Sequence, residues 1–404
     1  MPTINNDKYN IGIVLPRTAD GGHFQLALSI ADSLLKYSHV YNYKILYFDE
    51  DSIKWIAARK EIAGLIPVSE RTLWQRICTY INILIRFRLL PMSNTEQLTG
   101  LKDAGIKLLI VPFPGLFGFM NDLPYIICIS SLPHKYYPKP PVGPPLKTRF
   151  VWNTVVENAS KYSVLSTVDS ERGMEDLNKY YGVSKDKIRI IPHIPSGYIY
   201  ENRDMDIETA DKILDKVDLP DKFIFYPAQF VNGKNHIRLL KALKSIKQQY
   251  KIEIPLVLAG SVNESYKDVM EMIKNLKMID QVVYPGYVSD KEITALYKKA
   301  AALVYPSLFG PTNLPPLEAM IMGTPVTCSN LFAMPEQVGD AAILFDPFSI
   351  EDMAEKIRTI WVDENLRAKL IKKGYEKIKD ITQQNYAGQW ERAIENALVR
   401  IQRT

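Results

Sequence analysis

The sequence predicts an α/β protein built from two doubly wound parallel sheets. Short apolar runs of strand length alternate with helical patterns along most of the 404 residues, and this alternation starts again near residue 223. Strands that are apolar at nearly every position are typical of parallel sheets, because helices cover both faces. A polar, irregular segment at 192–205 separates the two series. We therefore expect one domain at 1–195 and a second at 205–383.

The first series starts with a strand at 11–15, a glycine-containing loop and a helical pattern at 23–37. Further strand-like runs follow at 43–48, 107–113, 125–130, 162–167 and 187–192. The stretch 133–149 is rich in proline, which lacks the backbone N–H group that a helix interior and a central strand both need. We therefore expect a long loop there.

The second series repeats the alternation. Its strand-like runs are 223–227, 255–260, 281–285, 301–305, 325–329 and 341–345, and a helical pattern at 235–249 follows the first of them. Ser289 and Glu292 have the spacing of a capping box, which predicts a helix that begins at residue 290. From residue 350 the pattern is helical to the end of the sequence.

Composition limits the class of protein. Apolar residues make up 47% and charged residues 24%, as in globular chains, and the formal net charge of +5 is distributed over mostly interspersed acids and bases. Nucleic-acid binding needs a clustered basic face, so we expect no nucleic-acid partner. Three distant cysteines indicate a reducing, cytoplasmic compartment, and no Cys/His spacing predicts a metal site. We expect neither a signal peptide nor a spanning helix.

The most informative segment is 305–329, YPSLFGPTNLPPLEAMIMGTPVTCS. It is typical of a strand end, a Gly/Pro/Asn loop, a short helix and another strand. The free N–H groups and the dipole at such a helix start favour an anion. We expect Glu318 in the first helical turn, where its carboxylate could accept hydrogen bonds from a pair of sugar hydroxyls. A nucleotide would suit this arrangement, and an ordinary turn with a dipole-complementing glutamate is the alternative.

The segment resembles the donor-site signature of the family 4 retaining glycosyltransferases, which have the GT-B fold. That signature has two glutamates eight positions apart, and Gly310 stands here in place of the first; the run Phe309–Asn313 resembles a branch of the family with the same replacement. The resemblance implies two Rossmann-like domains facing a central cleft: an acceptor-side domain that includes a last helix at about 384–404, and a nucleotide-sugar-binding domain. The matching positions are Glu318-Ala319-Met320, Gly323 and Pro325-Val326.

The resemblance also implies roles for individual residues. Lys234 corresponds to the cation that binds the diphosphate, while Gln229 stands where relatives have an arginine and supplies no charge. His134, in SLPHKYYP, corresponds to a histidine near the donor sugar, so that His134 and Lys234 are the expected catalytic residues. The expected donor-binding residues are Gly21, Gly22, Gln229, Lys234, Tyr287, Val288, Gly310, Pro311, Thr312, Asn313, Leu314 and Glu318.

By this resemblance the protein is a metal-independent enzyme. It would move a hexose, for example mannose, from a nucleotide diphosphate sugar to a hydroxyl of a glycan or lipid-linked saccharide, in surface polysaccharide assembly and without another cofactor. Two alternatives remain: a sugar-nucleotide epimerase with the same fold, and a non-catalytic subunit that binds nucleotide sugar. Dinucleotide binding is a weaker alternative, because the first loop lacks the G-x-G-x-x-G pattern.

The segment from Arg71 to Leu90, RTLWQRICTYINILIRFRLL, contains four arginines and no acidic residue. Its apolar residues have helical spacing. We favour a core helix with a partly exposed basic edge, and the alternative is a helix lying on an anionic membrane. In that second case the protein would be peripheral to the inner face of the membrane.

Overall fold

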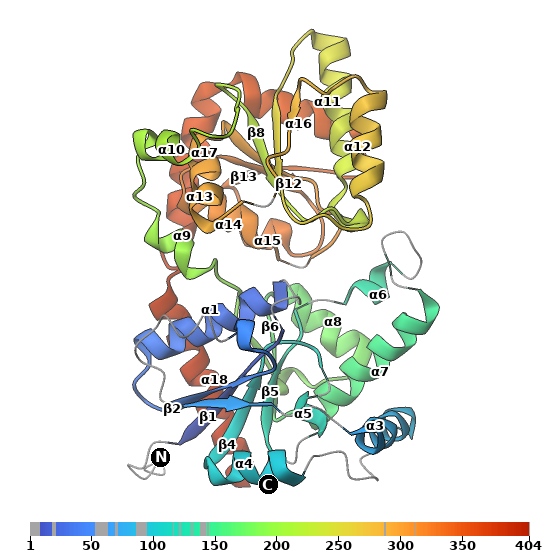
Figure 1. Cartoon of the computed structure of the whole chain (residues 1–404), viewed down its shortest axis with the longest axis vertical. Coiled ribbons are helices and arrows are strands. Elements are labelled where there is room, and N and C mark those ends of the chain that lie inside the picture. The colour runs from blue at the N-terminus through green and yellow to red at the C-terminus, as the bar shows by residue number, and fades with distance from the viewer. Residues whose placement is uncertain are drawn as a thin grey trace. The chain divides into compact units, whose positions relative to one another are not determined.

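The computed structural model describes residues 9–17, 22–52, 64–68, 72–85, 95–115, 117–120, 123–130, 132–137, 143, 145–286, 288–310 and 312–403. The chain divides into two compact units (Figure 1). The first takes most of the chain up to Ile194 together with the C-terminal segment from Thr382, and the second takes Pro195–Ile381. Among the described residues, no helix is both long and apolar enough to cross a bilayer.

In the first unit the described strands form one parallel sheet of seven strands in the order β3-β2-β1-β4-β5-β6-β7. The order runs outward from β1 in both directions, as expected for a doubly wound fold. The short strand β3 has no counterpart in the sequence prediction. The strands are β1 (Asn10–Leu15), β2 (Asn42–Tyr47), β3 (Leu65–Pro67), β4 (Ile106–Val111), β5 (Tyr125–Cys128), β6 (Leu165–Val168) and β7 (Ile188–Ile190).

Helices pack on this sheet, and the last helix of the chain is one of them. Helix α18 packs against α1 and buries Tyr386, Trp390, Ile394 and Leu398, which lie four residues apart on one face (Figure 1). The helices are α1 (Gly22–Tyr37), α3 (Leu73–Ile85), α4 (Thr95–Asp103), α5 (Phe117–Met120), α6 (Pro133–Tyr136), α7 (Leu146–Tyr162), α8 (Glu171–Tyr181), the 3₁₀ turn η2 (Lys185–Lys187) and α18 (Gln383–Arg403).

Two predictions for this unit are wrong. The proline-rich stretch 133–149 is not a continuous loop, because α6 lies in it and α7 begins at Leu146. Pro145 occupies the cap position before α7, where the lack of an N–H group costs nothing. Helix α3, which we expected in the core, instead buries Cys78, Thr79 and Asn82 and exposes its apolar side. Residues 86–90 of that prediction lie outside the described part of the chain.

The second unit also contains a parallel sheet, with six described strands in the order β10-β9-β8-β11-β12-β13. The chain winds to one side after β8 and to the other side after β11. The point between these two strands is therefore a topological switch point, where loops diverge and ligands bind in open α/β sheets. The strands are β8 (Ile224–Pro227), β9 (Leu256–Ala259), β10 (Val282–Val283), β11 (Ala302–Tyr305), β12 (Val326–Ser329) and β13 (Ala342–Phe345).

The helices of this unit cover both faces of the sheet (Figure 1). One group contains α11, α12 and α16, and the other contains α13, α14 and α17 with the short helices α9 and α10. The predicted capping box is confirmed at Ser289 and Glu292. The helices are α9 (Gly197–Glu201), α10 (Ile207–Ile213), η3 (Asn232–Lys234), α11 (His236–Tyr250), α12 (Tyr266–Asn275), α13 (Asp290–Lys299), α14 (Leu314–Ile321), α15 (Met334–Val338), α16 (Ile350–Val362) and α17 (Glu364–Ile378).

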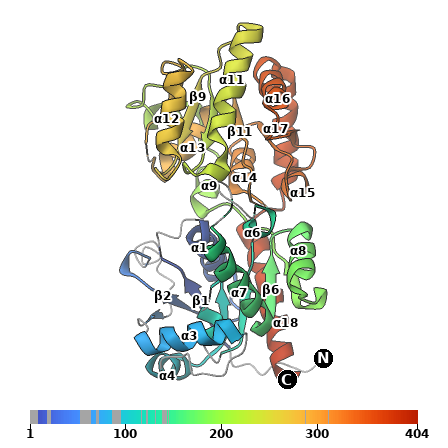
Figure 2. The same cartoon turned by 90° about the vertical axis from the view of Figure 1, so that its right-hand side faces the viewer.

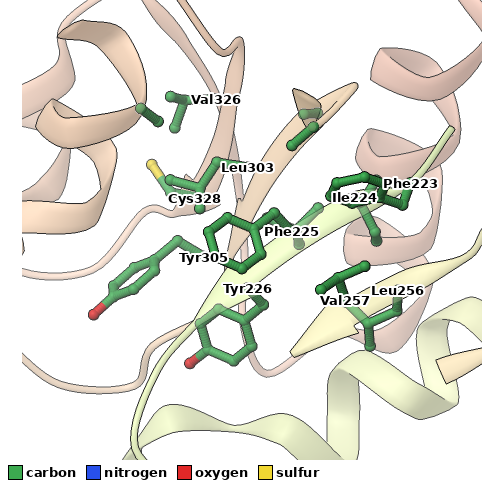
Figure 3. Close-up of a cluster of buried hydrophobic side chains, with 14 of the residues drawn as sticks. Phe223, Ile224, Phe225, Tyr226, Leu256, Val257, Leu303, Tyr305, Val326 and Cys328 are labelled. Carbon is green, nitrogen blue, oxygen red and sulfur yellow. The ribbon is translucent and has the colours of Figure 1, made fainter. Parts of the chain in front are cut away.

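The segment 192–205 is not the irregular linker that its polar composition predicts. It contains α9, whose Ile199 is fully buried in the core of the second unit. In that core the ring of Tyr226, on β8, and the ring of Tyr305, on β11, meet edge to face with centroids 5.5 Å apart. Figure 3 shows both rings at one end of the cluster, with their hydroxyl groups pointing to the same side. The apolar core thus ends in two polar groups at the switch point.

Candidate functional site

The polar groups of the candidate site come from the loops that follow β8 and β11 in the second unit. Lys234 ends the 3₁₀ turn η3 after β8, and Asn313 immediately precedes α14 after β11. Tyr226 is the last residue but one of β8, and Tyr305 is the last residue of β11. The carboxyl ends of parallel strands meet at one edge of a sheet, so the fold brings these four residues together at the switch point.

Lys234 is held by neutral groups. Its ammonium Nζ donates to Tyr305 Oη at 2.7 Å and to Asn313 Oδ1 at 3.3 Å, and its carbonyl accepts a hydrogen bond from Tyr226 Oη at 2.6 Å. Within the described part of the chain, Lys234 forms no ion pair with a carboxylate. Burial lowers the pKa of this ammonium to about 8. At neutral pH the site therefore contains a mostly protonated cation that no carboxylate of the described residues pairs with.

Asn313 is the centre of the hydrogen-bond network. Its Oδ1 also accepts from Tyr305 Oη at 3.0 Å, and its Nδ2 donates to the carbonyl of Gly310 at 3.4 Å. Gln337 fixes the backbone of Asn313 from both sides, accepting from its N–H at 3.0 Å and donating to its carbonyl at 2.8 Å. Asn313 is nearly buried, so its orientation is set by these partners rather than by solvent.

Gly310 is required by the geometry of this loop. Its φ of +115° lies in the region that favours glycine, and a Cβ atom there would lie 2.7 Å from both side-chain polar atoms of Asn313. A glutamate at this position would displace Asn313. The loop instead closes on the side chain of Asn313.

The start of α14 offers fewer N–H groups than a helix usually does. Positions 311, 315 and 316 are prolines, which have none, and Asn313 donates its N–H to Gln337. In the described part of the loop, Gly310, Thr312 and Leu314 are the other residues that carry a backbone N–H group. We therefore expect a smaller amide contribution to anion binding than the sequence suggested.

Glu318 does not lie in the first turn of α14, as we had predicted. The helix starts at Leu314, so Glu318 is its fifth residue and is only 7% exposed. Tyr297 donates a hydrogen bond to Glu318 Oε2 at 2.6 Å. Burial raises the pKa of this carboxyl to about 7; the bond from Tyr297 opposes the rise, and the charge of Asp290 adds to it.

The other predicted donor-binding residues are more scattered. Gln229 is exposed in the loop after β8, and its carbonyl accepts from the N–H of Val231 at 2.8 Å. Val288 is partly buried against the core of the second unit, just before α13. Gly22 opens α1 in the first unit. Gly21, Tyr287 and Pro311 lie outside the described residues.

His134 lies in α6 of the first unit and is 3% exposed. Its Nε2 lies 2.6 Å from Tyr181 Oη, and that hydroxyl donates to Asn153 Oδ1 at 3.0 Å. Because Tyr181 has a single hydroxyl proton, His134 donates through Nε2 and leaves a lone pair on Nδ1. Burial lowers the pKa of His134 to about 4, and Lys135 and Arg149 add to the effect. The imidazole is therefore neutral at pH 7 and acts through hydrogen bonds, not charge.

Sequence reasoning missed several residues of the site. Tyr226 and Tyr305 read as ordinary apolar strand ends, and no sequence pattern connects Gln337 with Asn313. Asn235 immediately precedes α11, and its side chain makes no capping bond. Its Nδ2 instead donates to the carbonyls of Pro306 and Pro347, at 3.1 and 2.9 Å, which joins the loops after β11 and β13 to the start of α11.

Solved structures share the fold of the whole chain. A glycosyltransferase from Rickettsia africae superposes with a TM-score of 0.72 at 16% identity, covering 98% of this chain and all of that one. Alr3699/HepE from Anabaena, in complex with UDP-glucose, superposes with a TM-score of 0.74 at 14% identity, covering 96% of this chain and 99% of that one. The predicted GT-B fold is confirmed.

Sequence comparison finds a matching family model and several relatives. Residues 208–377 match the model described as "Glycosyl transferases group 1". The "O-antigen chain mannosyltransferase B" of Escherichia coli is 31% identical over 152 residues, which are 38% of this chain and 40% of that protein. The "Serotype-specific mannosyltransferase WbdA" of Escherichia coli is 26% identical over 225 residues, 55% of this chain and 27% of that protein. The chain thus spans less than half of these relatives. Over residues 208–377, less than half of its length, the chain is therefore similar to the group 1 glycosyl transferases.

Proposed function

We propose that the protein is a retaining glycosyltransferase that moves a hexose from a nucleotide diphosphate sugar to a hydroxyl group. Several relatives are mannosyltransferases, and two of these are named for O-antigen chains. We therefore propose mannose as the hexose, a glycan or lipid-linked saccharide as the acceptor, and assembly of a surface polysaccharide as the process.

One observation carries the proposal. Lys234 presents a cation at the switch point of the second sheet, fixed by Asn313 and Tyr305 but not neutralised by them. A diphosphate is the ligand whose charge suits such a site, and an ammonium binds phosphate strongly through charge-assisted hydrogen bonds. The N–H groups at the start of α14 add to this attraction.

The remaining contacts follow from the positions of the other residues in this unit. Glu318 would accept hydrogen bonds from the ribose, for which its carboxylate must be ionised. The turn at Tyr287 and Val288 would pass its backbone beside the nucleobase, and Gln229 would donate one amide hydrogen bond to the diphosphate. Thr312 and Leu314 would contribute through their backbone.

The chemistry demands little from side chains. The diphosphate is the leaving group, and Lys234 would offset the charge that develops on it, so the proposed reaction proceeds without a metal ion. Retention of configuration would follow from attack on the same face, with the departing phosphate oxygen accepting the acceptor's proton. Neutral His134 would hydrogen-bond a hydroxyl of the donor sugar, and the loop with Gly21 and Gly22 would approach the donor closely.

The test begins with donor binding. A panel of nucleotide diphosphate sugars is screened for a rise in melting temperature, because a ligand that binds only the folded state stabilises it by mass action. Lys234→Ala should abolish the rise, and Lys241→Ala, at an exposed lysine of α11, should leave it unchanged. A shift that persists fully in Lys234→Ala would contradict the assigned site.

Product analysis then separates the candidate activities. Acceptor-dependent release of nucleotide diphosphate supports the transferase. Isomerised sugar nucleotide in the absence of acceptor would indicate an epimerase, and saturable binding without turnover would indicate a binding subunit.

A further inference from the structure

Helix α3 turns its apolar side to solvent. Leu73 is 75% exposed, Trp74 63%, and Tyr80 64%, with Ile77 and Ile81 at 41% and 38%. These five positions repeat at intervals of three to four residues and so form one face of the helix. The opposite face, which the fold buries, contains Cys78, Thr79 and Asn82. The helix therefore presents to water the side that an ordinary amphipathic helix would bury.

A neighbouring helix has the same character. Helix α3 packs against α7, and the first two turns of α7 expose further large apolar side chains: Leu146 (71%), Phe150 (56%), Val151 (37%) and Trp152 (45%). Figure 2 shows α3 and α7 on the side of the first unit that faces the viewer. We call these nine side chains the α3–α7 surface. Scattered exposed apolar residues are normal, but a whole apolar helix face turned to solvent, as in α3, marks an interaction site.

The charge of the surrounding sequence selects the kind of partner. Segments 71–95 and 123–162, which contain these two helices, have nine basic residues and one acidic residue, Glu157, an excess of eight positive charges. That excess is larger than the formal net charge of +5 of the whole chain, so the rest of the chain is net acidic. Basic residues interleaved with tryptophan, phenylalanine and leucine are the composition of helices that lie in the interface of an anionic membrane.

We infer that the α3–α7 surface binds the surface of an anionic lipid bilayer. The aromatic and aliphatic side chains would enter the interfacial region, where tryptophan and tyrosine are favoured, and the basic residues would pair with lipid phosphates. A second copy of this chain fits less well, because two such surfaces would bring like charges together. The inference is independent of the proposed transfer, since it concerns binding without any donor.

The position of Trp152 gives this surface a consequence for the first unit. Its ring packs edge to face on the ring of His134, with centroids 6.1 Å apart. The membrane-binding surface therefore adjoins the buried histidine of the same unit, and a lipid-linked substrate held at the bilayer would arrive beside it.

Flotation with lipid vesicles tests the inference. The wild-type protein should float with vesicles of phosphatidylcholine and phosphatidylglycerol and bind pure phosphatidylcholine at least about tenfold more weakly, and high salt should weaken the binding. Trp74→Gln/Ile77→Gln should reduce binding to the anionic vesicles at least about tenfold. The matched control is Val262→Gln/Ile279→Gln in the second unit, where two apolar residues with exposures of 60% and 62% should be replaceable without effect.

Two further variants make the test specific. Lys147→Glu, at an exposed lysine of α7, should weaken binding to anionic vesicles. Lys241→Glu, at an exposed lysine of α11, should not. With brominated lipids, wild-type tryptophan fluorescence should be quenched, and Trp74→Phe should retain binding while losing much of the quenching. Unchanged melting temperature and donor binding show that each variant is folded.

Three results would overturn the inference. The first is absence of binding to anionic vesicles at low salt, and the second is equal binding by the wild-type protein and Trp74→Gln/Ile77→Gln. The third is self-association that disappears in this double variant while no vesicle binding is found, which would assign the surface to a second copy of the chain.

Discussion

Lys234 Nζ lies 3.3 Å from Asn313 Oδ1, a contact that joins two loops 79 positions apart in the sequence. Tyr305 Oη lies 2.7 Å from the same ammonium and 3.0 Å from the same amide oxygen. The three polar atoms therefore form a closed triangle. Because neither partner of Lys234 is charged, the triangle orients the cation and leaves its charge available to a ligand.

A change of one atom beside this triangle, the Nδ2 of Asn313, should weaken donor binding. Asn313→Asp preserves the size of the side chain but places a carboxylate beside Lys234, where it would pair with the ammonium and repel a diphosphate. We expect at least a tenfold loss of nucleotide-sugar affinity, or about 1.4 kcal/mol, measured by calorimetry. Asn275→Asp, at an exposed asparagine ending α12, is the control. Equal affinities in the wild-type protein and Asn313→Asp would exclude a role for the free charge.

Gly310 should not tolerate a side chain. Gly310→Ala must adopt a positive φ and also push Asn313 away, so we expect a lower free energy of unfolding, by roughly 1–3 kcal/mol, and weaker donor binding. Gly286→Ala is a matched control, because Gly286 has a φ of +90° but open space around its Cβ position. The difference between the two variants in urea unfolding isolates the clash with Asn313. If both lose the same stability and donor affinity, the clash is unimportant.

Donor affinity should fall as pH rises above 8. The pKa of Lys234 is lowered to about 8, so its charge is lost between pH 7 and 9.5, over a range in which an exposed lysine stays protonated. Lys234→Arg remains charged throughout and should bind donor with little pH dependence over the same range, although its absolute affinity will differ. The unfolded chain binds more protons here, so this lysine also makes the free energy of unfolding rise between pH 8 and about 10.5. A flat affinity profile for the wild-type protein would contradict the assignment.

Glu318→Gln should stabilise the protein while weakening donor binding. Burial raises the pKa of Glu318 from an ordinary 4.5 to about 7, so the folded state binds more protons and the free energy of unfolding falls as pH rises from 4.5 to 7. Above pH 7 the buried charge costs stability, and glutamine should recover roughly 1–3 kcal/mol at pH 8 but much less at pH 5. Urea unfolding at both pH values measures the gain in stability. Glu355→Gln, at an exposed glutamate of α16, serves as the control. No gain at pH 8, or unchanged donor affinity, would count against this role.

The strand pattern predicted most of the fold because parallel strands carry an uninterrupted apolar signal. The prediction failed where tertiary contacts, rather than the local sequence, determine the structure of an element or its orientation. The strand β3 is too short for a periodic signal, and α9 is polar in composition yet fixes its one buried isoleucine, Ile199, in the core. The orientation of α3 depends on which of its faces the neighbouring helix covers, and no periodicity in α3 itself reveals that.

Part of the candidate site was predictable because some of its residues belong to a local sequence motif. Lys234 and Glu318 have fixed places in a local motif, and the sequence shows both. The partners that define their chemistry lie far away in the chain: Asn313 is 79 positions from Lys234, and Tyr297 is 21 positions from Glu318. The shifted pKa values arise from burial and from these distant partners, so they require the folded structure.

The return of the C-terminal helix to the first unit determines an order of assembly. Residues 195–381 form one continuous segment that contains all the described strands of the second unit and can fold as soon as it has been synthesised. The first unit begins earlier but lacks Tyr386 and Trp390, two of its fully buried side chains, until α18 has left the ribosome. The domain that is translated first is therefore completed last, and during this interval the surface of α1 that α18 later covers is open to chaperones.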